Sequence, residues 1–109
     1  MKLLTRPEEL VLLAVWRLQD DAYCVLIREQ LMGVTGRDWS FGAIYDPLDR
    51  LEKKGLLESN LSEPTQQRGG RSKRIYKLTK TGLEALIEIK NVEEAMWEGI
   101  SKPSLKRSL

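Results

Sequence analysis

The side chains of this sequence that could do chemistry are mostly cations. From position 64 to position 83 there is no acidic residue, and basic side chains surround the paired glycines Gly69 and Gly70. They are Arg68, Arg71, Lys73, Arg74, Lys77 and Lys80. Lysine and arginine beside a flexible turn bind phosphate oxygens well, so phosphate binding is the chemistry that this stretch predicts.

Residues for catalysis or metal binding are missing from the sequence. The chain has no histidine and a single cysteine, Cys24, which excludes the usual zinc ligand sets and an intrachain disulfide. Nothing pairs a nucleophile with a base. We therefore expect Cys24 to be a structural thiol in a protein that is not an enzyme and needs no cofactor.

The composition predicts one globular domain. The chain has 109 residues, of which 41% are hydrophobic, and its net charge is only +2. No apolar run approaches the roughly 20 residues that span a bilayer. Residues 1–9 lack the core of a signal peptide. These features favour a cytoplasmic protein that does not bind membranes.

The basic turn at Gly69-Gly70 has three possible uses. It could hold a nucleotide phosphate, but it lacks the Walker spacing and no helix is expected right after it. It could be a solvated loop without a partner, as charge runs usually are. It could also lie along a DNA backbone or enter the minor groove. Its position after a third predicted helix favours DNA.

That third helix is predicted over residues 40–54, with Ser40 as its cap. An apolar face would pack on the core through Phe41, Ile44, Leu48 and Leu51. The opposite face carries Ser40, Gly42, Ala43, Asp46, Arg50 and Lys53 or Lys54. Small side chains near a helix start allow close approach to base edges in the major groove. Tyr45 lies between the two faces, and core packing is favoured over DNA contact.

Pro47 complicates the third helix. In a helix that begins at Ser40, Pro47 lacks the amide that would bond to the Ala43 carbonyl, so the helix should bend there. Alternatively, Asp46 caps a helix that begins at Pro47. The apolar spacing continues through Pro47 from Phe41 to Leu51, which favours one bent helix.

The other elements predict a mainly α protein with a small two-stranded β wing. A helix starting at Thr5 or Arg6 is apolar almost all round from Leu10 to Leu18. Either the chain wraps it, or a second copy covers it. A second helix, starting near Tyr23, should end at Gly33. Gly55 should close the third helix before two strands, at residues 56–61 and 73–79.

A final helix is predicted from Lys80 to Ile100, capped by Thr79. Its far half has nothing left in its own chain to bury it, so we expect it to cross the first helix of a second subunit. The predicted dimer residues are Leu12, Trp16, Ile89, Met96 and Trp97. The domains are then a winged helix-turn-helix domain at 1–79, a dimerisation helix at 80–100 and a flexible tail at 101–109.

Several blocks together resemble the PadR-type transcriptional regulators, in particular the short branch with one carboxy-terminal helix. The blocks are Ser40–Tyr45, Leu48–Leu57, Arg68–Arg71 and Tyr76–Gly82. The likeness extends from about Thr5 to Trp97. Two positions depart from the pattern: many relatives have proline where this chain has Asp46, one residue before Pro47, and glycine where it has Cys24.

This resemblance implies a winged helix-turn-helix homodimer that binds a palindromic operator, usually as a repressor. The matching groove-facing positions are Ser40, Gly42, Ala43 and Tyr45, and the matching wing positions are Arg68, Arg71 and Lys73. In some relatives aromatic residues at the dimer seam hold hydrophobic effectors, although plain packing is the more common role of such a tryptophan. The competing interpretation is a winged-helix module for protein contact.

Overall fold

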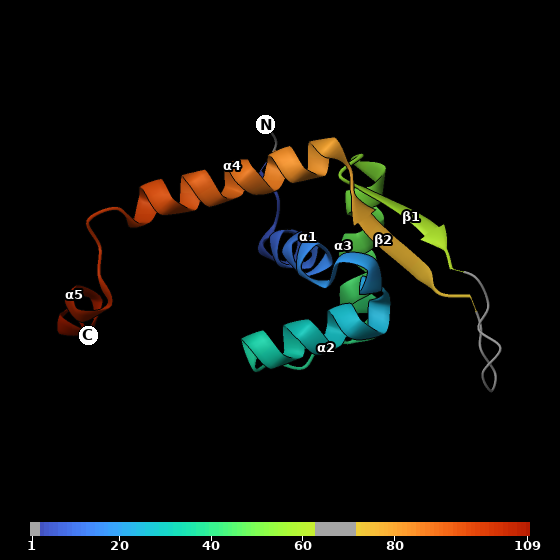
Figure 1. Cartoon of the computed structure of the whole chain (residues 1–109). Coiled ribbons are helices and arrows are strands. Elements are labelled where there is room, and N and C mark those ends of the chain that lie inside the picture. Colours follow the sequence, from blue (N-terminus) through green and yellow to red (C-terminus); the bar gives the residue numbers. More distant parts are fainter. Residues whose placement is uncertain (1–2, 63–71) are drawn as a thin grey trace.

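The computed structural model describes residues 3–62 and 72–109. Its helices and strands are α1 (Arg6–Leu18), the 3-10 turn η1 (Gln19–Asp21), α2 (Cys24–Thr35), α3 (Phe41–Lys53), β1 (Leu57–Leu61), β2 (Arg74–Leu78), α4 (Lys80–Trp97) and α5 (Lys102–Arg107). The first three helices and the strands pack together, while α4 runs past α1 and away from the wing (Figure 1). The predicted fold class, mainly α with a two-stranded wing, is confirmed.

α1 lies at the centre of the core, as its apolar sequence predicts. Thr5 and Glu8 form a capping box at its start. Leu12 is fully buried within its own chain, which corrects its assignment to the dimer surface. Leu13 and Trp16, on another side of the helix, are 45% and 44% exposed. The chain therefore wraps α1 only in part.

α2 is longer than the sequence suggests. It continues through Gly33 to Thr35 and ends at Gly36, whose φ of 68° is left-handed. Glycine is tolerated inside a helix when neighbouring contacts support it. Here the Thr35 hydroxyl donates to the Leu31 carbonyl and accepts from the Trp39 indole, which anchors the last turn.

α3 is one helix that includes Pro47, as the apolar spacing predicts. The side chains of Ile44, Pro47, Leu48 and Leu51 are buried. The proline ring therefore packs in the core, and this burial compensates for the backbone hydrogen bond that Pro47 cannot donate. Phe41 departs from the prediction because its side chain is 47% exposed. It lies in the first turn, where the Arg28 guanidinium covers its ring.

The wing is an antiparallel pair in which Leu57 faces Leu78 and Leu61 faces Arg74. Gly55, at a φ of 76°, makes the expected left-handed exit from α3. The Tyr76 amide donates to the Ala22 carbonyl at 2.8 Å, which ties β2 to the segment between α1 and α2. The predicted turn residues Arg68, Gly69, Gly70 and Arg71 lie outside the described part of the chain.

α4 starts at its predicted cap, Thr79, but ends at Trp97 rather than Ile100. A short helix, α5, follows where a flexible tail was expected, because Ser101 forms a capping box with Ser104 and Pro103 favours a first helical turn. Every residue from 91 to 100 is exposed. Within residues 3–62 and 72–109, no helix combines the length and apolar character needed to cross a membrane.

Candidate nucleic-acid interface

The start of α3 presents small, exposed residues. The Ser40 hydroxyl accepts a hydrogen bond from the Ala43 amide at 3.1 Å, which fixes the first turn. Gly42 and Ala43 are exposed. Among the described residues, a Cβ at Gly42 would have only the Ser40 hydroxyl nearby, at 3.9 Å, so this turn is not crowded by them. A flat ligand surface could therefore come close to the backbone of α3 here.

Tyr45 belongs to the exposed face and not to the core, which corrects the sequence interpretation. Its side chain is 51% exposed, whereas the neighbouring Ile44 is fully buried. A hydrogen bond with Cys24 raises the pKa of Tyr45. Burial raises the pKa of the Cys24 thiol, which fits the predicted structural role. Cys24 and Tyr45 line the same hollow, at the edge of α3.

The start of β2, at the turn end of the wing, lies on the same side as Tyr45. The Lys73 ammonium lies 4.2 Å from the centre of the Tyr23 ring. Tyr23, Tyr45, Lys73 and Arg74 line one shallow hollow of about 230 Å³ between the start of α2, α3 and β2. The structure thus brings the predicted residues Tyr45 and Lys73 together and adds Tyr23, which sequence reasoning had treated as an apolar marker of a helix.

Arg28 holds the start of α3 from the neighbouring helix α2. Its guanidinium donates to the Trp39 carbonyl and, at 3.2 Å, to the Asp38 carboxylate. The same group lies 4.9 Å from the centre of the Phe41 ring. Sequence reasoning missed this role, because Trp39 lies eleven positions from Arg28, in the link before α3, where no periodic pattern connects the two.

Arg50 has a partner inside the chain. Its Nε donates to the Glu8 carboxylate at 3.3 Å, and the Lys54 Nζ donates to the same oxygen at 2.7 Å. The Glu8 side chain is only 1% exposed. Arg50 thus forms an ion pair between α1 and α3, while 47% of its side chain stays exposed, and the DNA contact predicted for it stays a prediction.

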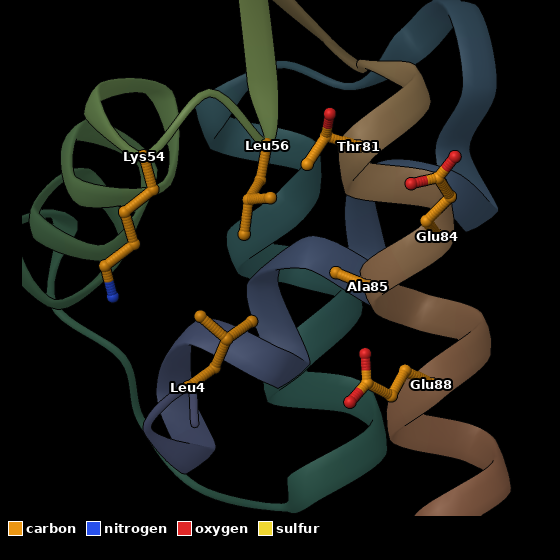
Figure 2. Close-up of a pocket in the computed structure, with 7 residues that line it drawn as sticks. All are labelled: Leu4, Lys54, Leu56, Thr81, Glu84, Ala85 and Glu88. Atoms are coloured by element: carbon orange, nitrogen blue, oxygen red, sulfur yellow. The ribbon is translucent and has the colours of Figure 1, made fainter. Parts of the chain in front are cut away.

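The electrostatics of Glu8 follow from these contacts. Its desolvation by burial favours the neutral acid, but the hydrogen bond from Lys54 and those from Thr5 outweigh it. The result is a pKa of about 2 for Glu8, which is ionised at neutral pH. Figure 2 shows the Lys54 side chain reaching from the end of α3 toward the start of α1, near Leu4.

A second surface lies between α1 and α4, away from the hollow lined by Tyr45 and Lys73. Leu10, Leu13, Trp16, Leu83 and Ile87 help to line a mainly apolar groove of about 540 Å³. Beyond it, Met96 and Trp97 are 73% and 50% exposed. Ile89 also lines the groove and is half-buried. Four predicted dimer residues, Trp16, Ile89, Met96 and Trp97, are thus accessible to a partner, unlike Leu12.

The model of the transcriptional regulator PadR-like family matches residues 12–88, a span that includes α2, α3 and the wing. The chain belongs to the PadR-like family. Its members are DNA-binding transcription factors that are not enzymes, so this PadR-like chain is a transcriptional regulator. No curated protein matches its sequence.

Solved structures agree with this assignment. A PadR-like transcription factor from Bacteroides fragilis is 27% identical with a TM-score of 0.69, over 87% of this chain and 89% of that one. A PadR family regulator from Clostridium difficile is 31% identical with a TM-score of 0.61, over 88% and 97%. One from Eggerthella lenta is 26% identical with a TM-score of 0.65, over 84% and 77%.

Proposed function

We propose that this PadR-like protein is a repressor that binds a palindromic operator as a homodimer in the cytoplasm. The observation that carries this proposal is one exposed surface shared by the start of α3 and the start of β2, where Tyr45 and Lys73 line the same hollow. In this arrangement α3 enters the major groove, with Ser40, Gly42 and Ala43 nearest the bases. Lys73 contacts the phosphate backbone, and Arg68 and Arg71 extend that contact along the wing.

The dimer part of the proposal rests on the apolar groove between α1 and α4. The far half of α4 carries Val92, Met96 and Trp97, all at least half exposed in the single chain. Packing this half into the α1–α4 groove of a second copy buries both surfaces at once. Two α3 helices then lie about one DNA turn apart, roughly 34 Å.

Binding to labelled duplex from the protein's own upstream region tests the DNA part. We expect sequence-selective binding that weakens steeply with salt. Lys73→Ala should weaken binding on all duplexes and lower the salt slope by about one. Ala43→Gln should change the preferred sequence, since Ala43 lies at the exposed start of α3. Lys102→Ala, at an exposed lysine on α5, is the matched control and should leave binding unchanged.

The competing function is a winged-helix module for protein contact. It would be supported if the protein shows no sequence preference on its upstream DNA while Lys73→Ala still weakens binding to an acidic protein partner.

A hydrophobic small molecule in the groove lined by Trp16 and Ile87 is a further part of the proposal. Quenching of tryptophan fluorescence by a flat apolar ligand would report its binding.

A further inference from the structure

α3 is held at both ends by charged side chains from other helices. At its start, Arg28 of α2 binds the Trp39 carbonyl and the Asp38 carboxylate. At its end, Glu8 of α1 accepts hydrogen bonds from Arg50 and Lys54. The two contacts differ in burial: Glu8 is 1% exposed, while Asp38 is 84% exposed. The buried Glu8 carboxylate thus depends on its two partners, whereas the exposed Asp38 can be solvated by water.

Glu8 belongs to the helix that also carries the groove for a second subunit. Leu13 and Trp16 line that groove about one and a half and two turns further along α1. One rigid helix thus contacts the end of α3 on one side and the proposed partner on the other. The contacts from Arg50 and Lys54 to Glu8, at 3.3 Å and 2.7 Å, therefore favour one orientation of α3 relative to α1.

We propose that Glu8 is a positioning residue for operator recognition, which sets the angle of α3 relative to α1 and thereby the separation of the two α3 helices in the dimer. This inference rests on the proposed homodimeric, DNA-binding function. Glu8 touches no DNA in this scheme. It acts through α3, and its effect is selectivity for the distance between operator half-sites.

Glu8→Gln tests this role with little change in shape. Glutamine retains the reach of glutamate and serves equally well in a capping box, so the start of α1 is preserved while the charge is lost. Glu84→Gln is the matched control, because Glu84 is an exposed glutamate on α4 that does not line the α1–α4 groove. Binding is measured on operators with the native half-site spacing and with one base pair added or removed.

We expect the wild type and Glu84→Gln to prefer the native spacing strongly. Glu8→Gln should lose about tenfold of that preference, corresponding to about 1.4 kcal/mol. Its salt dependence should not change, because no phosphate contact is removed. If Glu8→Gln lowers the melting temperature but keeps the full spacing preference, Glu8 has only a structural role and the inference is wrong.

A second variant covers the case in which Glu8→Gln does not fold. Lys54→Met removes a partner whose side chain is 38% exposed, and leaves Glu8 bonded to Arg50 and Thr5. It should reduce the spacing preference in the same direction, and an unchanged preference would overturn the inference. Failure of the proposed function looks different: the wild type itself would then show no preference for any sequence or spacing.

Discussion

At the scale of single residues, the contacts of Glu8 and Tyr45 say most about how this regulator works. Both are polar groups whose surroundings are unusual for their type: Glu8 is buried and Tyr45 is half exposed. Buried carboxylates are rare unless they are paired, and exposed aromatic residues often mark a binding surface. Glu8 contacts the end of α3, and Tyr45 lies on the exposed face of the same helix.

The Glu8 contacts predict a loss of stability in acid. The folded pKa of about 2 lies below the ordinary value of 4.5, so the ionised form stabilises the fold above pH 4.5. This contribution, up to about 3 kcal/mol, is lost as the pH falls from 4.5 toward 2. Urea unfolding at a series of pH values should show Glu8→Gln less stable than the wild type at pH 7.

The same measurement should show the two proteins converging near pH 2. Glu84→Gln serves again as the control and should follow the wild type closely. A constant difference between the wild type and Glu8→Gln at every pH would mean that the lost interaction does not depend on the charge of Glu8.

At the scale of elements, the junction between the wing and α4 depends on a glycine. A Cβ at Gly82 would lie 2.0 Å from the Leu56 carbonyl oxygen, so the start of α4 packs directly on the backbone between α3 and β1. The Thr79 hydroxyl also donates to the Gly55 carbonyl at 2.6 Å. The direction in which α4 leaves the wing is therefore fixed by backbone contact and not by long side chains.

Gly82→Ala should destabilise the protein by about 3 kcal/mol, because a backbone segment must move to make room. Gly42→Ala is the matched substitution at an exposed site, where helix propensity should raise stability by up to about 1 kcal/mol. Thermal unfolding measures both. Equal effects of the two changes would contradict the close packing at Gly82.

Much of this architecture could be predicted from the sequence, because caps and apolar spacing act locally. Ser40, Gly55 and Thr79 each mark an element boundary where the structure has one. The exposure of Phe41 and Tyr45 could not be predicted, since helical spacing alone gives both a place beside the core. The surroundings of both side chains depend on α2: Arg28 lies over the Phe41 ring, and Cys24 lines the same hollow as Tyr45.

Glu8 shows a second limit of sequence reasoning. An acid in the first turn of a helix usually interacts with the helix dipole, and the sequence supports only that role. Its partners Arg50 and Lys54 lie 42 and 46 positions away, where no pattern links them. The sequence therefore predicts a DNA contact for Arg50 but not its ion pair with Glu8.

At the scale of the whole molecule, an apolar surface dominates the α1–α4 side. Ile87→Asp, at a side chain 55% exposed in the groove, should separate the proposed dimer, because a charge would be buried at the contact. Sedimentation equilibrium should then give the mass of one chain, 12.5 kDa, instead of twice that value. Operator binding should weaken together with dimerisation.

Val34→Asp provides the control for this change. Val34 is 69% exposed on α2 and does not line the groove, so the variant should keep the mass of the wild type. If Ile87→Asp and the wild type have the same mass at all protein concentrations, the α1–α4 groove is not the contact between subunits.

The projecting half of α4 has a consequence for gene control. In the proposed dimer, pairing through α4 releases free energy only when two chains meet, so the amount of pairs rises with the square of the amount of single chains when pairing is weak. Promoter occupancy would then respond to the copy number of the regulator more steeply than first order. For the proposed repressor, a modest drop in synthesis, or dilution as the cell grows, would relieve silencing without any signal molecule.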